Sequence, residues 1–467
     1  MPSETDLKAR YEAAGQGHVL AHVDKIASTE EKEAFLAQLE GIAVERIAAL
    51  LASAKADQGA GADAVIAPIT GNVGRSTDAA FVAKVRPIGM EAIGQGKVAA
   101  LVLAGGQGTR LGFDGPKGCY NIQLPSQKTL FEIMAERIIK LRQLAGGDAK
   151  LPFFVMTSPI NHMATEAFFR EKNFFGLGEE SVFLFEQGML PCLTEEGKII
   201  LETKSKVAMA PDGNGGIYPS LKASGGLDKM IADGVQYLHI FSIDNALVKP
   251  ADPVFMGHCI AEGADCGNKS VWKSHPHEKV GVVALRGGKP CVVEYSEISA
   301  AMAEQVGADG RLAFGAGNIC NHFYTLDFLK NVVLANMGDL YHIARKKIPY
   351  YDAEKDEIIK PTENSGLKLE TFIFDVFPFS TKMAILEAER SEEFAPVKNA
   401  PGSSSDSPDT ARAMISAISK SWMKAAGATL EGDESGATLC EILPLTSYAG
   451  EGLEAYKDQV VKCSFSL

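Results

Sequence analysis

The stretch LVLAGGQGTRLGFDGPKG, residues 101–118, decides the fold, because an apolar run ends here in glycines followed by an arginine and a lysine. The apolar run is typical of a buried strand. Glycines have no Cβ, so several backbone N–H groups can approach one anion, and Arg110 and Lys117 add positive charge. The stretch therefore predicts a loop at the end of a strand that binds phosphate.

This loop differs from the two common glycine motifs that bind phosphate. A P-loop requires G-x-x-x-x-G-K-[ST], whereas Lys117 follows Pro116. A dinucleotide-binding fingerprint requires G-x-G-x-x-G, but after Gly106 and Gly108 the third position falls on Leu111. The two cations, rather than a known glycine spacing, carry the phosphate interpretation.

From residue 99 onwards, short apolar runs alternate with amphipathic segments. KVAALVLA, LPFFVMTS, SVFLFEQ and QYLHIFSIDN are expected strands, and TLFEIMAERIIKLRQLAGG is an expected helix that ends at its glycines. Such alternation indicates an α/β fold with a doubly wound, mostly parallel sheet. Ligands bind to these sheets at the carboxyl ends of the strands, which is where the glycine-rich loop falls.

The pattern predicts three regions along the chain. Residues 1–98 are expected to form a helical N-terminal domain, in which Ser28 and Glu31 have the spacing of a capping box before a helical run. Residues 99–400 are expected to form the catalytic domain. The linker NAPGSSSDSPD precedes a small C-terminal α+β domain, residues 401–467.

Length and composition exclude several classes of protein. A chain of 467 residues is too long for one ordinary core. The net charge of −13 argues against a nucleic-acid-binding protein, and no apolar segment approaches the length of a membrane span. The 8 cysteines contain no C-x-x-C pair, so neither a zinc ribbon nor a disulfide scaffold is indicated. We therefore expect a cytoplasmic protein.

Several dense motifs follow the glycine-rich loop in a fixed order. They include QGMLPC (187–192), MAPDGNGGIY (209–218), SIDN (242–245), VVEYSE, GNICNHFY, KLETFIFDVF and EFAPVKN. Together with LAGGQGTRLG and PKG, this set resembles the eukaryotic-type UDP-N-acetylhexosamine pyrophosphorylases over nearly the whole chain. The resemblance implies a Rossmann-like nucleotidyltransferase fold. It also implies a reaction in which UTP and N-acetylglucosamine 1-phosphate give UDP-N-acetylglucosamine and pyrophosphate.

The resemblance implies roles for particular residues in nucleotide binding and catalysis. Arg110, Lys117 and Lys398 correspond to cations that hold the reacting phosphates. The nucleotide is expected to contact Leu103, Ala104, Gly105, Gly106, Lys117, Gln187, Gly213 and Lys368. Taken singly, Gln187 is equally typical of a surface turn, and Lys368 and Lys398 of solvated lysines.

The sugar phosphate is expected to contact a second set of residues, which the resemblance places at Asn214, Gly281, Glu294, Tyr295, Asn318, Phe372, Phe374 and Lys398. Asn318 suits an acetamido group, and Glu294 can accept hydrogen bonds from sugar hydroxyls. Without the resemblance, the alternation of Phe372 and Phe374 favours core packing on one face of a strand.

Asp244 follows the apolar run QYLHIFSI and has two interpretations. A carboxylate at this point often caps the next helix. It can also be the one protein ligand of a Mg²⁺ ion whose other ligands are substrate phosphates and water. The resemblance favours the metal, with Mn²⁺ left open as an alternative to Mg²⁺.

The leading hypothesis is thus a uridylyltransferase for an N-acetylhexosamine 1-phosphate. A UDP-glucose or broad UDP-sugar pyrophosphorylase is the alternative enzyme, and an inactive binding paralogue is the alternative from another class. Arg110, Lys117, Asp244, Lys368 and Lys398 are all present, which argues against the inactive paralogue. The sequence leaves open the glucosamine or galactosamine epimer, the regulation and the oligomeric state.

Overall fold

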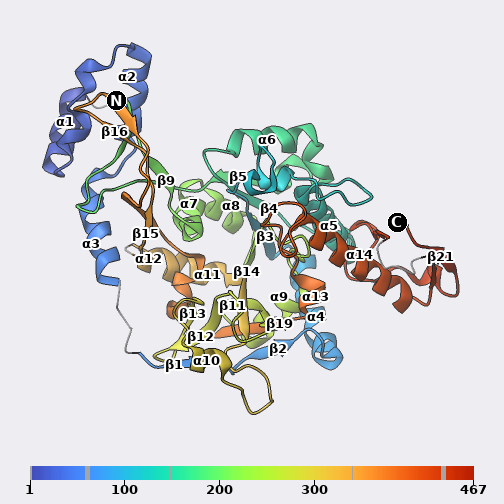
Figure 1. Cartoon of the computed structure of the whole chain (residues 1–467). Coiled ribbons are helices and arrows are strands. Elements are labelled where there is room, and N and C mark those ends of the chain that lie inside the picture. Colours follow the sequence, from blue (N-terminus) through green and yellow to red (C-terminus); the bar gives the residue numbers. More distant parts are fainter. Residues whose placement is uncertain (1–2, 58–63, 148, 339, 433–437) are drawn as a thin grey trace. The chain divides into compact units, whose positions relative to one another are not determined.

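The computed structural model describes residues 3–57, 64–147, 149–338, 340–432 and 438–467. The chain divides into two compact units, which we name by their dominant elements (Figure 1). The helical unit comprises residues 1–64, 187–220 and 334–375, and the sheet unit comprises residues 65–186, 221–333 and 376–467. These limits differ from the three expected regions, because segments distant in the sequence join one unit. Whether the expected regions fold independently stays a prediction.

The sheet unit is built on one large sheet with the strand order β2-β19-β11-β14-β10-β3-β4-β5. Its strands are β2 (Val73–Arg75), β19 (Met383–Ala388), β11 (Cys266–Trp272), β14 (Ala316–Thr325), β10 (Tyr237–Ser242), β3 (Val98–Leu103), β4 (Phe153–Thr157) and β5 (Val182–Glu186). Three further strands extend it through β14, namely β1 (Ile66–Pro68), β12 (Val282–Arg286) and β13 (Lys289–Val293). All residues of β3 and β4 are buried, as their apolar runs predicted.

The sheet is rich in parallel pairs but mixed. β10, β3, β4 and β5 are parallel neighbours, and so are β11, β19 and β2. β14 lies between these two groups and is antiparallel to both β10 and β11. The α/β class is confirmed. The expected mostly parallel sheet holds for the two groups of parallel strands, but not for β14 or for β1, β12 and β13, which pair antiparallel.

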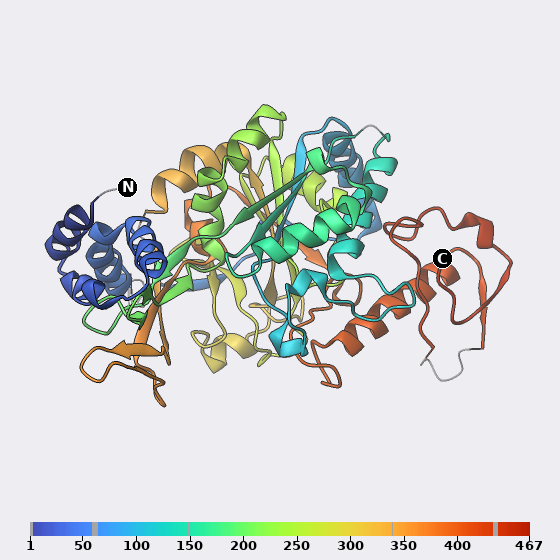
Figure 2. The same cartoon turned by 90° about the horizontal axis from the view of Figure 1, so that it is seen from above.

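Helices lie on both faces of this sheet (Figures 1 and 2). They include α4 (Ala79–Gly94), α5 (Leu130–Leu144), α6 (His162–Glu171), α8 (Gly226–Ala232) and α9 (Pro253–Glu262). α4 and α9 pack backbone against backbone, because a Cβ on Gly89 would lie 2.0 Å from the Pro253 carbonyl oxygen. Their close approach therefore requires glycine at this contact.

Helix α5 forms for reasons that the sequence shows. Thr129 and Glu132 form a reciprocal capping box at its N-terminus. Its apolar face, which includes Phe131 and Ile138, is fully buried. Gly147 follows the helix with a φ of 72°, in the left-handed region that favours glycine. The predicted helix and its stop are both confirmed.

The C-terminal part of the sheet unit begins with α14 (Pro408–Ala425), whose N-cap is Ser407. Ala411 and Ile415 of this helix belong to the hydrophobic core that also contains β3 and β4. A smaller apolar cluster around Met423 and Cys440 accompanies the short parallel pair β20 (Thr429–Glu431) and β21 (Val460–Lys462). The region is thus α+β in content and shares the core of the sheet unit.

The helical unit contains α1 (Glu4–Ala13), α2 (Thr29–Glu40) and α3 (Ile47–Asp57). Short strand pairs complete it, namely β6 (Met189–Pro191) with β9 (Met209–Pro211), β7 (Leu201–Thr203) with β8 (Lys206–Val207), β15 (His342–Lys346) with β18 (Gly366–Glu370), and β16 (Tyr350–Asp352) with β17 (Glu357–Ile359). The helices share one core with Leu193 and Leu367.

The N-cap predicted at Ser28 is confirmed, because its side chain accepts a hydrogen bond from Glu31 N at 3.2 Å. The Glu31 carboxylate instead accepts a hydrogen bond from the Ser205 hydroxyl. The cap of this helix is therefore the Ser28 side chain, without the reciprocal bond of a capping box.

In the part of the chain that the structure describes, no helix combines the length and apolar character needed to cross a membrane.

Candidate functional site

The glycine loop, residues 104–118, follows β3 at the carboxyl end of the parallel strands. Lys117 N donates to the Gly106 carbonyl oxygen at 3.1 Å, which closes the loop on itself. Asn161 Nδ2 donates to the carbonyl oxygens of Ala104 at 2.9 Å and Gly106 at 3.3 Å, and Ser158 Oγ donates to that of Gly105 at 2.9 Å. Side chains that follow β4 therefore hold the loop by its carbonyl groups.

The residues of the expected nucleotide contact lie in order along this strand and loop. Leu103 ends β3 and is buried, Ala104 is buried, Gly105 is half-buried and Gly106 is exposed. A Cβ on Gly106 would meet no atom within 4 Å, so the backbone there faces open space. The loop thus presents bare main chain at its start, as a close approach of a ligand requires.

Arg110 and Lys117 carry the two positive charges of the loop. Arg110 lies in a short 3₁₀ turn, Thr109–Leu111, and is exposed, whereas Lys117 is half-buried. Burial lowers the pKa of the Lys117 amine below its ordinary value. The Asp244 carboxylate opposes this pKa shift, and the positive charge of Lys398 adds to it. The groups therefore interact electrostatically.

Asp244 and Lys398 are brought together by the sheet, although they are distant in the sequence. Lys398 Nζ lies 3.8 Å from Asp244 Oδ2, and the Lys398 side chain is 48% exposed against 17% for Asp244. Val397 N donates to the Asp244 carbonyl oxygen at 2.8 Å. Ile243 N donates to the Leu103 carbonyl oxygen at 3.2 Å, so Asp244 follows the strand end beside the one from which the glycine loop starts. The sheet unit thus places Lys398 next to Asp244, close to the loop that carries Arg110 and Lys117.

The helix-cap interpretation of Asp244 is wrong. The next helix, α9, begins at Pro253, and its N-cap is Asp252, whose Oδ1 accepts from Val254 N at 3.0 Å. The Asp244 carboxylate instead lies next to the Lys398 ammonium. Its carboxylate is therefore available to a ligand rather than to a helix terminus.

The residues around Asp244 allow a divalent cation only with help from a ligand. Among the residues that the structure describes, no group of three or more His, Cys, Asp or Glu side chains could hold a metal ion. One hard carboxylate oxygen suits a Mg²⁺ ion that arrives with a nucleotide, because such ions take most ligands from phosphate and water. The donor set fits that mode of binding.

A second group of predicted residues lies on the antiparallel strands of the sheet unit. Asn318 N donates to the Gly281 carbonyl oxygen at 2.8 Å, and a Cβ on Gly281 would lie 3.1 Å from Glu294 Oε1. Burial, and the nearby Glu297 carboxylate, raise the pKa of Glu294. Tyr295 is 51% exposed and lines a cavity of about 300 Å³. The structure therefore brings three of the residues expected to bind the sugar together, Gly281, Glu294 and Asn318, and none of these three lines the cavity beside Tyr295.

The other predicted residues lie in the helical unit. Gly213 has a φ of 88°, and a Cβ there would lie 2.2 Å from the Thr371 carbonyl oxygen, so only glycine fits. Asn214 Oδ1 accepts from Ile373 N at 2.9 Å, which gives this side chain a structural contact. Gln187 is half-buried and precedes β6. Lys368 is half-buried on β18, opposite Ala344.

The expected strand face for Phe372 and Phe374 is wrong. β18 ends at Glu370, and a 3₁₀ segment follows from Ile373 to Phe379. The two rings are half-buried and stack on each other at 5.2 Å, and His342 stacks on Phe372 at 4.8 Å. Each ring therefore packs against a neighbouring ring and keeps part of its surface exposed.

One buried acid in the helical unit escaped the sequence analysis. Asp212 is 7% exposed, and its Oδ1 has no hydrogen-bond partner. A Cβ on Gly188 would lie 2.3 Å from its Oδ2, and a Cβ on Gly216 would lie 2.0 Å from its Oδ1. Burial raises its pKa to about 6. Gly188 of QGMLPC and Gly216 of MAPDGNGGIY make room for this carboxylate. The acid between glycine-rich motifs was visible in the sequence, but its burial was not.

A separate cavity of about 520 Å³ in the helical unit contains none of the predicted residues. His18, His22, Tyr350 and Tyr351 are among its lining residues.

All 8 cysteines are free thiols, and burial raises the pKa of several of them, including Cys192 to about 11. Burial and the Asp244 carboxylate raise the pKa of the Cys320 thiol to about 12, so this thiol stays protonated at neutral pH.

The chain is similar to known proteins in sequence and in fold. The model of a family described as UTP–glucose-1-phosphate uridylyltransferase matches residues 84–432. The chain is 44% identical to UDP-N-acetylhexosamine pyrophosphorylase-like protein 1 from Homo sapiens, over 98% of this chain and 95% of that protein. It is 40% identical to UDP-N-acetylglucosamine pyrophosphorylase from Saccharomyces cerevisiae, over 98% of each chain.

A solved structure extends the similarity to the fold. It is a uridine diphosphate N-acetylglucosamine pyrophosphorylase from Trypanosoma brucei, with a TM-score of 0.85 and 32% sequence identity. The match covers 97% of this chain and 95% of that chain. Similarity in sequence and in fold therefore extends over nearly the whole length.

Proposed function

The chain belongs to the UTP–glucose-1-phosphate uridylyltransferase family, with UDP-N-acetylhexosamine pyrophosphorylases among its relatives, and we propose that it transfers the uridylyl group of UTP to N-acetylglucosamine 1-phosphate. The observation that carries the proposal is that Lys398 lies 3.8 Å from Asp244 at the carboxyl end of β10, next to the parallel strand β3 from which the loop with Arg110 and Lys117 starts. Cytoplasm is the proposed compartment.

The proposed reaction needs no protein nucleophile. A phosphate oxygen of N-acetylglucosamine 1-phosphate attacks the α-phosphorus of UTP in line. The bond from this phosphorus to the oxygen that bridges to the β-phosphate breaks, and pyrophosphate leaves with that oxygen. UDP-N-acetylglucosamine is the other product. Positioning and charge neutralisation supply most of the catalysis in such transfers.

The cations have distinct roles in this proposal. Arg110 is exposed and can bind two phosphate oxygens with its planar guanidinium. Lys117 is half-buried and neutralises the charge of the triphosphate, and Lys398 neutralises the charge that the attacking and leaving groups share. Asp244 is the protein ligand for Mg²⁺, or Mn²⁺, which when bound offsets negative charge on the phosphates.

The remaining residues select the substrates. In the sheet unit, Asn318 binds the acetamido group, Glu294 accepts from sugar hydroxyls, and Gly281 and Tyr295 form the wall beside them. In the helical unit, Gln187 and Gly213 bind the uracil ring, since an amide can both donate and accept as the imide edge requires. Lys368 binds phosphate there. Asn214, Phe372 and Phe374 contact the N-acetyl sugar.

One assay tests this proposal against the alternatives. The protein is incubated with UTP, Mg²⁺ and each of four sugar 1-phosphates: N-acetylglucosamine, N-acetylgalactosamine, glucose and galactose. Pyrophosphate release is measured by a coupled reaction. We expect kcat/KM to be highest for N-acetylglucosamine 1-phosphate. A higher value for glucose 1-phosphate would assign a UDP-glucose pyrophosphorylase, and no release with any sugar would favour an inactive paralogue.

A nucleotide series completes the test. With N-acetylglucosamine 1-phosphate held constant, UTP should be used better than CTP, ATP or GTP. Cytosine replaces the N3–H donor of uracil with an acceptor, so a site built for the imide edge leaves a polar group unpaired. Equal use of CTP would contradict the roles proposed for Gln187 and Gly213.

A further inference from the structure

The segment that ends at Lys398 is joined to the loop that begins at Asp244. Val397 N donates to the Asp244 carbonyl oxygen at 2.8 Å, and Ala246 N donates to the Ala395 carbonyl oxygen at 3.0 Å. The loop itself is held by helix α5, because Arg137 donates to two of its carbonyl groups, each at 2.8 Å. The position of Lys398 therefore depends on how firmly residues 393–397 are held against this loop.

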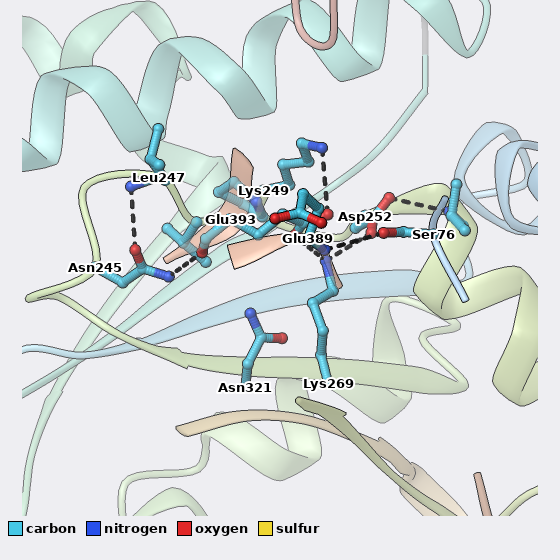
Figure 3. Close-up of polar contacts among 12 residues, drawn as sticks. Ser76, Asn245, Leu247, Lys249, Asp252, Lys269, Asn321, Glu389 and Glu393 are labelled. Carbon is cyan, nitrogen blue, oxygen red and sulfur yellow. Dashed lines mark hydrogen bonds and ion pairs between the residues drawn. The ribbon is translucent and has the colours of Figure 1, made fainter. Parts of the chain in front are cut away.

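Asn245 is the central polar contact of this junction (Figure 3). Its Nδ2 donates to the Glu393 carbonyl oxygen at 2.7 Å, and its Oδ1 accepts from Ala395 N at 2.9 Å. The same Oδ1 accepts from Leu247 N at 3.2 Å. One buried amide, 3% exposed, thus bonds to the main chain of both segments. A side-chain amide supplies both the donor and the acceptor that these contacts need. Glutamine also carries an amide, but its side chain is longer.

An ion cluster lies beside Asn245 and holds the same segment by its side chain (Figure 3). Lys269 on β11 donates to Asp252 Oδ2 and to Glu393 Oε2, each at 2.6 Å. Lys249 Nζ lies 3.2 Å from Glu393 Oε1. The side chain of Lys269 is fully buried, and that of Glu393 is 3% exposed. Glu393 therefore accepts from a lysine at each of its oxygens.

Electrostatics hold this cluster in its charged form. Burial alone lowers the pKa of the Lys269 amine, but the carboxylates of Asp252 and Glu393 raise it above its ordinary value. Burial likewise raises the pKa of Asp252, and Lys269 and Lys249 bring it below its ordinary value. A buried charge that loses its partner is costly, so the members of the cluster hold one another in place.

We propose that Asn245 and Glu393 are positioning residues that set the distance between Lys398 and Asp244, and hence the geometry of the uridylyl transfer. The inference rests on the proposed function, since it assigns these residues to the same phosphate site. Neither side chain is placed on a substrate. They act through the main chain of residues 393–397, which the Asn245 amide and the Lys269 ammonium fix at its start.

The first test is Glu393→Gln, which keeps the shape and removes the charge. Lys269 retains Asp252, so the variant should fold. Because a misplaced catalytic group costs rate rather than affinity, we expect kcat to fall roughly 10–100-fold with little change in the KM for UTP. Glu136→Gln is the matched control: Glu136 is buried and paired with Lys128 in the same unit, and its kcat should stay at the wild-type value.

The second test is a double-mutant cycle. If Glu393 acts through Lys398, then Glu393→Gln should lower kcat in the wild-type background and have no further effect in Lys398→Ala. Asn245→Ala should behave in the same way. Independent, multiplicative losses in the double variants would overturn the proposal, because they would show that the two positions contribute separately.

A measurement without substrate separates this proposal from the proposed function. Amide hydrogen exchange is followed in a peptide that contains residues 394–398. Glu393→Gln and Asn245→Ala should raise exchange there, whereas Glu136→Gln should not. Faster exchange with unchanged kcat would overturn the positioning role and leave the proposed function intact. Faster exchange in a protein that transfers no uridylyl group to any sugar phosphate would refute the function, and the positioning role with it.

Discussion

The Nζ atom of Lys398 lies 3.8 Å from Oδ2 of Asp244. This distance exceeds that of a direct hydrogen bond. The two side chains thus lie close enough to interact electrostatically while both keep surface for a ligand, and phosphate oxygens can bind the lysine on one side and a cation the carboxylate on the other. The relationship makes Asp244 the sharpest position at which to test the site.

Asp244→Asn keeps the shape of the side chain and removes its charge. We expect normal folding and a loss of kcat of roughly 10²–10³-fold, with partial recovery at high Mg²⁺, because the amide is a weaker ligand for a hard cation. Activity is measured by pyrophosphate release over a Mg²⁺ titration. Asp228→Asn, at an exposed aspartate of α8 in the same unit, is the control. Full activity of Asp244→Asn at limiting Mg²⁺ would remove the residue from the mechanism.

Arg110→Ala should abolish most phosphate binding by the glycine loop. Arg110 is exposed, so its loss should leave the melting temperature unchanged while kcat/KM falls roughly 10²–10³-fold. Isothermal titration with UTP should show weaker binding. The exposed Arg86 of α4 provides the control variant Arg86→Ala. A lower melting temperature with normal kinetics would mean that Arg110 has a structural role.

Lys117→Arg should change the pH profile. Burial lowers the pKa of the Lys117 amine, so this group loses its charge, and its hold on phosphate, at a lower pH than an ordinary lysine does. Arginine stays charged throughout, so the alkaline limb of kcat/KM should move to higher pH in the variant. The profile is recorded with pyrophosphate release from about pH 6 to about pH 10. An unmoved alkaline limb would show that another group controls it.

Asn318→Ala should reduce selectivity between sugars. The proposed contact with the acetamido group favours N-acetylglucosamine 1-phosphate over glucose 1-phosphate, and its loss should lower the ratio of their kcat/KM values roughly 10–100-fold. Asn318 Oδ1 also accepts from Cys320 N at 3.2 Å, so some stability is lost, but a ratio cancels that loss. Asn331→Ala, at an exposed asparagine of the same unit, should leave the ratio unchanged.

Asp212→Asn should stabilise the protein at neutral and alkaline pH. The pKa of Asp212 is raised from 3.8 to about 6, so the folded state holds this proton more tightly than the unfolded state does. The free energy of unfolding therefore falls as pH rises from about 4 to about 6, by at most about 3 kcal/mol, and stays low above that range.

Urea unfolding of the wild type and of Asp212→Asn, without ligand, measures this effect at about pH 5 and about pH 8. The gain in stability should be larger at the higher pH. Asp24→Asn, at a carboxylate that is 79% exposed, should show no such dependence. An equal gain at both pH values would show that the asparagine stabilises for a reason unrelated to the buried charge.

The local elements followed from the sequence. β3, β4, β5 and β10 form where apolar runs predicted strands, and α5 begins at a capping box and stops before glycines. These features depend on neighbours within a few residues, which the sequence displays directly. The position of the glycine loop after β3 followed from the same information.

Other predictions failed where tertiary contacts outweighed the local pattern. β14 enters the parallel-rich sheet antiparallel, and the TFIFDVF run forms a 3₁₀ segment rather than a strand. β14 pairs with β10 and β11, and Ile373 N donates to the side chain of Asn214. Both contacts are with segments distant in the sequence, which a local pattern does not include.

The sequence by itself determined the α/β class, the position of the glycine loop after a buried strand and, through its ordered motifs, the family. Only the tertiary structure decided which residues lie near Asp244 and what holds the segment that carries Lys398. Asn245 bonds to the main chain of Glu393 and Ala395, and Lys269 lies between Asp252 and Glu393. Asn245 belongs to the motif SIDN and Glu393 to EFAPVKN, but the sequence does not show that these two motifs meet. The physical reason is that burial and charge pairing depend on the packing of distant segments, whereas helices, strands and turns depend on near neighbours.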